Sequence, residues 1–235
     1  MKKSLLAMVA LSTISMCIGL MMGCKTNEMS KEQLDECDHI FQHYYQAHDF
    51  DALLKISPTL AESIRENAVF PMVGFYYGVV KTMPDKALVL RKAVEKNESL
   101  RTVIDDVIAG RDDSIAKLFD LSPKEYAPPL LDFFWGYFMA TGDKTVVEKV
   151  VRRGAMRVPS CCTVDLTAAA ARWSVNSLAK THPVVKEVLD DFLSHATEAE
   201  KKEFLQLQCG TAVGSDPIGT NGRMKCMDDI VLLED

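Results

Sequence analysis

The sequence is poor in the residues that several large protein classes require. Its 235 residues include only 12 glycines and nine prolines, which excludes collagen-like repeats and glycine- or proline-rich disordered chains. Basic residues are also outnumbered, with 27 Lys and Arg against 33 Asp and Glu and a net charge of −6. Because phosphate neutralisation needs clustered cations, nucleic acid is a poor partner for this chain. The 48% hydrophobic content is instead typical of a globular domain.

The sequence also lacks the motifs of common catalytic sites. No Gly-x-Ser-x-Gly elbow occurs, and the glycine-rich stretch 209–222 lacks the Gly-Lys-Ser/Thr that ends a P-loop. Paired carboxylates such as Asp105 and Asp106 point about 100° apart on a helix, so they do not converge on one substrate atom. These absences argue against an enzyme, and nothing in the sequence calls for a cofactor.

Long apolar runs are missing except at the start of the chain. Lys2 and Lys3 precede an uncharged, mostly apolar run at 5–22, which Gly23 and Cys24 follow. A basic start, an apolar stretch and a small residue before the cut form the plan of a secretory signal peptide. An uncleaved membrane anchor is the alternative, since the run is near the lower length limit for a span.

The residues that end at Cys24 resemble the signal of bacterial lipoproteins, whose lipobox ends at a cysteine that is diacylated and becomes the N-terminus. Met21 and Met22 depart from the usual residues of that box. The resemblance implies a signal peptide at 1–23 and a periplasm-facing anchor of palmitate-type chains on Cys24, each buried methylene contributing about 0.8 kcal/mol. Lys25 rather than aspartate after the cysteine favours the outer over the inner membrane.

After a polar tether at 24–33, apolar residues recur at spacings of three and four, the period of a helix. Prolines such as Pro58 and Pro71 are expected to end helices. No alternating run is long enough to predict a sheet. The predicted fold class is therefore all-α, with a helical domain over 34–208. One of its predicted apolar stripes consists of Leu88, Val89, Ala93 and Val94, and another consists of Val146, Val147, Val150 and Val151.

An internal echo predicts a repeated helix pair. Residues 75–86 align without a gap with 133–144, at an offset of 58, and Phe, Gly, Asp and Lys are identical in the two copies. In each copy an aromatic helix containing Gly78 or Gly136 ends at a turn, and a second helix follows. Small residues among aromatic rings indicate a close approach of helices. We therefore predict a short α-solenoid or a helical bundle of repeated helix pairs, with a third unit from about residue 168.

Two resemblances agree with this architecture. The turn and the Ala87-Leu88 that follow resemble a tetratricopeptide repeat, although the period differs. Residues 131–143, with Trp173-Ser174 and His182-Pro183, are similar to motifs of bacterial helical proteins of unassigned function. These resemblances imply a helical-repeat fold and carry no activity.

Residues 209–235 differ from the rest, because a glycine-rich loop precedes a tail, 228–235, that is acidic around an apolar run. We expect this tail to pack onto the helices. In an oxidising periplasm thiols close into disulfides. The best pair is Cys209 with Cys226, which would staple the loop and contribute about 3 kcal/mol. Sequence leaves open the pairing of the remaining cysteines, Cys37, Cys161 and Cys162.

Histidine offers one weak metal candidate. His39 and His43 are four residues apart on the predicted first helix, so they share a face and could hold zinc or copper with a third ligand from elsewhere. No glutamate follows His39 to make a His-Glu-x-x-His motif, and a partly exposed helix face is the alternative. His182 is expected near a helix end, where a cation complements the helix dipole.

The aromatic run 133–138 covers almost every direction around one helix, which is typical of a buried central helix. If part of that helix is exposed, Trp135 is the candidate for contact with a partner. Together these patterns predict a membrane-anchored periplasmic lipoprotein that acts as a protein-binding adaptor or scaffold, with an envelope protein as partner. The alternative is an envelope enzyme or a metal- or small-ligand-binding protein that uses His39, His43 or the loop 209–226.

Overall fold

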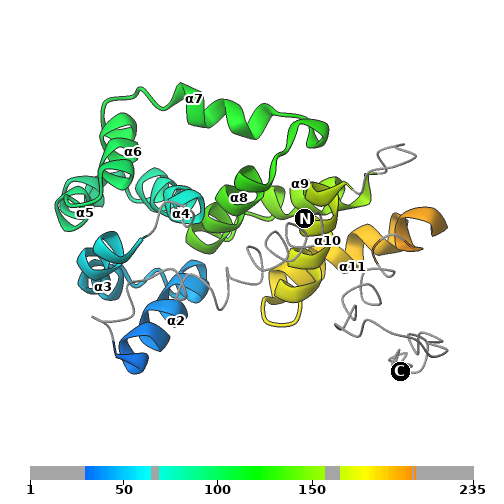
Figure 1. Ribbon diagram of the computed structural model, residues 1–235, viewed down its shortest axis with the longest axis horizontal. Coiled ribbons are helices and arrows are strands. Elements are labelled where there is room, and N and C mark those ends of the chain that lie inside the picture. The colour runs from blue at the N-terminus through cyan, green and yellow to red at the C-terminus, as the bar shows by residue number, and fades with distance from the viewer. Residues whose placement is uncertain (1–29, 65–68, 157–164, 203, 205–235) are drawn as a thin grey trace, which may run out of the picture.

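The computed structural model describes residues 30–64, 69–156, 165–202 and 204 (Figure 1). These residues form helices and no strand, which confirms the all-α prediction. The α-helices are α2 (Lys31–Ala47), α3 (Phe50–Ser63), α4 (Val69–Thr82), α5 (Ala87–Ala93), α6 (Glu98–Ile108), α7 (Asp113–Ala116), α8 (Pro128–Thr141), α9 (Lys144–Ala155), α10 (Leu166–Leu178) and α11 (Pro183–His195). Three short 3-10 helices are η2 (Pro84–Lys86), η3 (Lys117–Asp120) and η4 (Pro123–Glu125).

The first described helix begins inside the predicted tether. Ser30 and Gln33 form a capping box, in which the Gln33 backbone N–H donates to Ser30 Oγ (3.2 Å) and the Ser30 N–H donates to Gln33 Oε1 (2.9 Å). This box satisfies two backbone donors that a helix start leaves free. Helix α2 therefore begins before residue 33, the predicted end of the tether, because the capping signal precedes the first apolar residue of the helix.

Helices α4 and α8 lie side by side at the centre of the molecule (Figure 1). A Cβ atom on Gly136 would lie 1.8 Å from the Pro71 carbonyl oxygen, and one on Gly74 would lie 2.0 Å from the Phe133 carbonyl oxygen. A Cβ atom on Gly78 would likewise lie 2.8 Å from the Cβ of Ala140 on α8. The prediction that Gly78 and Gly136 allow two helices to approach closely is confirmed, and the helices are the two copies of the echo.

Aromatic side chains fill the space that the two helices share with α2. The Phe41 ring stacks on Phe75 at 4.6 Å between centroids, and the Tyr45 ring lies 4.9 Å from Phe138. The Tyr76 hydroxyl donates to Ser57 Oγ (2.9 Å), which links α4 to α3. Buried polar groups of this kind need such partners. The core is therefore centred on the predicted aromatic helices.

Three details differ from the sequence predictions. Pro58 lies inside α3 and Pro71 in the first turn of α4, so neither ends a helix; proline is tolerated in a first turn because those N–H groups have no helical partner. On α5, Leu88 and Val89 are 69% and 47% exposed. The inward residues of α5 and the turn after it are Ala87, Leu90 and Val94.

Helices α9, α10 and α11 form one end of the molecule, away from α3, α5 and α6 (Figure 1). Four valines of α9 are buried as predicted: Val146, Val147, Val150 and Val151. A Cβ on Gly154 would lie 2.9 Å from the Phe204 ring and 3.0 Å from the Arg172 side chain, so α9 packs closely on α10 there. Within the described ranges, no helix is both long and apolar enough to cross a membrane.

Candidate functional site

Helix α9 carries the first wall of the candidate site. Gly142 has a φ of 69°, in the left-handed region that glycine adopts at low cost, and it ends α8. Asp143 then caps α9 by accepting the Thr145 N–H (2.9 Å). With its valines turned inward, the helix presents an outward row at spacings of four: Lys144, Glu148 and Arg152.

Helix α11 carries the second wall. Pro183 occupies its first turn, where the missing N–H costs nothing. Its buried side contains Val185 and Leu189. The side that faces α9 presents a second row at spacings of four: Glu187, Asp191 and His195.

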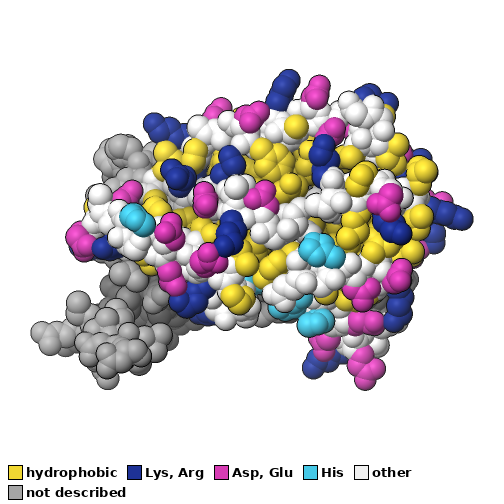
Figure 2. All heavy atoms as spheres, turned by 180° about the vertical axis from the view of Figure 1, so that it is seen from behind, with side chains coloured by type: hydrophobic (Ala, Val, Ile, Leu, Met, Phe, Trp, Pro, Cys, Tyr) yellow, Lys and Arg dark blue, Asp and Glu magenta, His cyan; other side chains and the backbone are white. Residues whose placement is uncertain are grey.

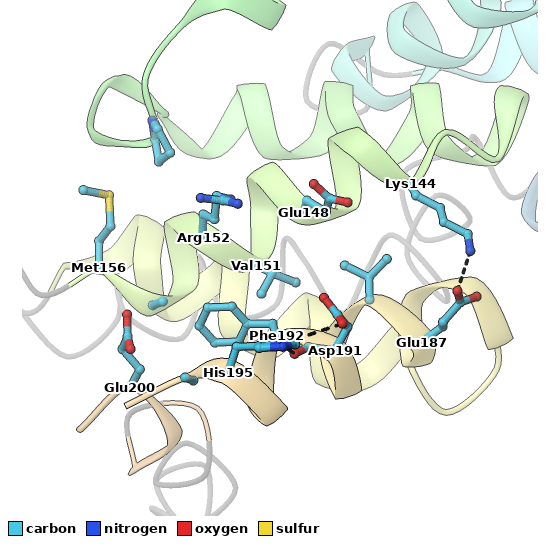
Figure 3. Close-up of a pocket in the computed structure, with 14 residues that line it drawn as sticks. Lys144, Glu148, Val151, Arg152, Met156, Glu187, Asp191, Phe192, His195 and Glu200 are labelled. Atoms are coloured by element: carbon cyan, nitrogen blue, oxygen red, sulfur yellow. Dashed lines mark hydrogen bonds and ion pairs between the residues drawn. The ribbon is translucent and has the colours of Figure 1, made fainter. Parts of the chain in front are cut away.

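The two rows enclose a groove of about 820 Å³ (Figure 3). We call it the α9–α11 groove; its walls are the two rows above and its floor is Val151, Val188 and Phe192. At one end the Lys144 ammonium pairs with the Glu187 carboxylate at 2.6 Å. The opposite end is lined by Met156, Ala196 and Glu200. Because the start of α9 lies at the start of α11, the two helices run in the same direction.

The charges of the groove are unequal. Among the described lining residues there are two basic side chains, Lys144 and Arg152, and four acidic ones, Glu148, Glu187, Asp191 and Glu200. Glu148 and Arg152 are exposed, and among the described residues neither has an ion-pair partner. Apart from the Lys144–Glu187 pair, the described charges of the lining are therefore one cation and three carboxylates.

The lining combines apolar and charged side chains. Apolar side chains lie in the middle and charged ones at the edges, as in surfaces that recognise peptides or proteins.

The predicted histidine pair lies at a second place, on α2. The His39 and His43 rings are 4.9 Å apart between centroids, and the His43 ring stacks at 5.5 Å on that of His182. In the described part of the chain, no three His, Cys, Asp or Glu side chains form a group that could hold a metal ion. Figure 2 shows histidine side chains reaching the surface among apolar and acidic atoms. Among the described residues, therefore, His39 and His43 have no third side chain placed to complete a metal site.

His182 differs from the prediction that it complements a helix dipole. It is fully buried at the N-terminal cap of α11, where a cation would oppose the dipole. Burial, with a smaller effect of His43, lowers the pKa of its imidazole to about 4. Its Nδ1 shares a 3.2 Å hydrogen bond with the Tyr45 hydroxyl. His182 is therefore neutral at pH 7 and belongs to the core.

Trp135 also belongs to the core. Its ring is 1% exposed, and its indole Nε1–H donates to Ser174 Oγ at 3.0 Å. The indole therefore has no face available to a partner in this structure. Cys37 is buried on α2. The other predicted positions lie outside the described residues: Cys24, Cys161, Cys162, Cys209, Cys226 and the loop and tail at 209–235.

The sequence analysis did not predict the groove, although the two rows of residues that form its walls can be read from the sequence. The row on α9 and the row on α11 each recur every four residues, but such rows are typical of any solvated helix face. Only the placement of α9 against α11 distinguishes these two from the other charged faces of the molecule.

No protein-family model matches the chain, and neither a curated protein nor a solved structure matches it. Its function is therefore inferred from sequence patterns and from the geometry of the groove.

Proposed function

We propose that the chain is a membrane-anchored periplasmic lipoprotein whose helical domain binds another protein, and that the α9–α11 groove is the docking surface. The groove is the observation that carries this proposal. It is bounded by two helices, its floor is apolar at Val151, Val188 and Phe192, and its edges are charged. An apolar centre with a polar rim is the usual anatomy of a protein interface.

The anchor in this proposal comes from the sequence. Cys24 after the apolar run at 5–22 would carry the acyl chains, and the helical body would face the periplasm from the outer membrane. Export to an oxidising compartment would also favour the Cys209–Cys226 disulfide. An adaptor held at a membrane meets its partners at a raised effective concentration.

The helices are also proposed to form repeated pairs. The contacts of Gly74 with Phe133 and of Gly78 with Ala140 advance together along α4 and α8, so these first helices of two pairs run in the same direction. The second helices α9 and α11 do so too. Stacked helix pairs with such parallel equivalents are the basis of helical-repeat proteins, whose grooves bind peptides and proteins.

The test is site-specific photo-crosslinking of the natively lipidated chain in cells. A benzoylphenylalanine replaces Glu148 or Asp191 in the groove, and matched probes replace the exposed Glu95 and Asp190 outside it. We expect one envelope protein to be crosslinked from both groove positions and from neither control, and to be lost in Cys24→Ala. Equal crosslinking from all four positions, or none from folded protein, contradicts the proposal.

The alternative, a metal-binding protein, has one supporting observation, the adjacent rings of His39 and His43. Protein purified without added metal would then contain stoichiometric zinc or copper, and His39→Ala would remove it. Metal content below a tenth of an equivalent, with unchanged crosslinking in His39→Ala/His43→Ala, would exclude this site.

A further inference from the structure

We propose that the α9–α11 groove selects a basic, amphipathic segment of its partner protein, with apolar side chains that enter the floor and Lys or Arg side chains that pair with the rim. This inference rests on the proposed function and specifies the chemistry of the partner. Three properties of the groove support it: its charge, its floor and its length.

The charge of the rim favours cations. Lys144 is already paired with Glu187 at 2.6 Å, so it contributes little to a ligand. Of the remaining described rim charges, Glu148, Asp191 and Glu200 are acidic, and Arg152 is the one cation without an ion-pair partner. Asp191 lies 3.8 Å from the ring of His195, and the Glu200 carboxylate accepts hydrogen bonds from Thr197, so Glu148 is the carboxylate with no described partner. Opposite charges across an interface steer encounter and select the partner. An anionic segment would meet three like charges for each opposite one.

The floor requires apolar anchors. Val151 and Val188 are 1% and 8% exposed, so they fix the base of the groove in the core and leave most of its apolar contact surface to Phe192. Phe192 is partly exposed, and its ring lies 5.4 Å from that of Phe204, which holds it in place. When anchor residues of a ligand enter a pre-formed pocket, the side chains of the receptor lose little conformational freedom.

The length of the groove sets the size of the segment. From Glu148 to Met156 the wall of α9 rises by about 12 Å, at about 1.5 Å for each helical residue. That length matches about two turns of helix or about four extended residues. A segment of one or two apolar anchors with flanking cations fits it.

The acidic tail of this chain is poorly suited to occupy the α9–α11 groove in place of a partner. Residues 228–235 contain Asp228, Asp229, Glu234 and Asp235 and no cation. Their apolar centre matches the floor, but their charges repel the rim. Charge therefore favours a separate basic partner over this segment.

The inference is tested by fluorescence anisotropy with the full lipidated chain in a nonionic detergent, and with empty micelles as the blank. The probe is a labelled synthetic peptide of about eight residues made of Leu, Lys and Ala in an amphipathic order. One comparison peptide replaces Lys by Glu and the other replaces Leu by Ser. We expect the first peptide to bind at least about tenfold more tightly than either, because both rim and floor contribute.

Matched charge reversals locate the site. Glu148→Lys lies in the groove, whereas Glu95→Lys lies after α5 at the other end of the molecule (Figure 1), and both change the net charge equally. Both side chains are exposed and make no ion pair with a described residue, so circular dichroism should stay unchanged. We expect Glu148→Lys to weaken binding about five- to tenfold and Glu95→Lys to change it less than about twofold.

Several results overturn the inference. Tighter binding of the Glu peptide, equal effects of the two reversals, or failure of all three peptides would each show that the groove does not select a basic amphipathic segment. Groove-specific crosslinking in cells would then still support docking at this site. Loss of that crosslinking contradicts the proposed function itself, so the two failures are distinguishable.

Discussion

The buried carboxyl of Asp132 predicts an unusual dependence of stability on pH. Asp132 is on α8, its Oδ1 is shut off from solvent, and no described residue hydrogen-bonds that atom. Burial therefore raises the pKa of the carboxyl from its ordinary value of 3.8 to about 7. A charge at this position is destabilising because it has lost its hydration without gaining a partner.

The sign follows from proton release in the two states. Below about pH 4 the carboxyl is protonated in both the folded and the unfolded chain. As the pH rises, the unfolded chain releases the proton first, so the free energy of unfolding falls until the folded group has also ionised near pH 7. A difference of about three pKa units corresponds to a loss of about 4 kcal/mol.

His182 opposes this change over part of the range. Its pKa is lowered from 6.5 to about 4, so the unfolded chain binds the extra proton between these values. Stability from His182 is therefore lost as the pH falls from 6.5 to 4, by about 3 kcal/mol. The two titrations nearly cancel in that window, and the natural chain should show a flat profile there.

Asp132→Asn removes the titration of Asp132, leaves that of His182 and keeps the shape of the side chain. We expect the variant to exceed the natural chain in free energy of unfolding by about 2 kcal/mol at pH 5 and about 4 kcal/mol at pH 8. Urea unfolding followed by circular dichroism at both values measures the difference. The exposed Asp190→Asn is the control, with changes within about 0.5 kcal/mol. An equal gain at both pH values, or a less stable variant at pH 8, would refute the reasoning.

Three further predictions concern the packing and the cysteines. Gly136→Ala should lower the free energy of unfolding by about 3 kcal/mol or more in thermal melts, although alanine favours helices, because its Cβ would lie 1.8 Å from a backbone oxygen of α4; a stabilised variant would contradict this close approach. Trp135→Phe should cost about 2 kcal/mol, from lost volume and from the lost 3.0 Å hydrogen bond to Ser174, in the same assay; a neutral substitution would argue against the bond. Cys209 and Cys226 should resist alkylation in the exported, unreduced protein and react after reduction, which mass spectrometry detects; modification of both thiols before reduction excludes the disulfide.

Local periodicity predicts the helices well and their surroundings less well. The valines of α9 and the ring-rich helix α8 are buried as the spacing predicts, because each pattern depends on neighbours within one helix. The prediction of an apolar stripe at Leu88 and Val89 is wrong for the converse reason. Apolar residues on every side of a short segment leave its inward face undecided, and contact of α5 with α3 and α6 selected Leu90 instead.

The echo predicted more than a local pattern can. Gly78 and Gly136 occupy equivalent positions at an offset of 58, and each lies against the other copy's helix. Neither the groove nor the buried acid could be found in this way. Both depend on which side of α8 or α9 meets another helix, and composition does not encode that choice.

The residues that stabilise the fold and those proposed to bind a partner can be separated by experiment. Asp132 is half-buried with its Oδ1 shut off from solvent, and it lies outside the described lining of the groove, so its substitution changes the free energy of unfolding and leaves the rim intact. Glu148 is exposed and unpaired among the described residues, so Glu148→Lys changes the rim charge at a cost to stability within about 0.5 kcal/mol. The two substitutions should therefore affect different quantities. Asp132→Asn should change the free energy of unfolding but not the peptide affinity, and Glu148→Lys should change the peptide affinity but not the free energy of unfolding. If both variants shifted affinity together, binding would depend on the stability of the whole helical body rather than on the α9–α11 groove.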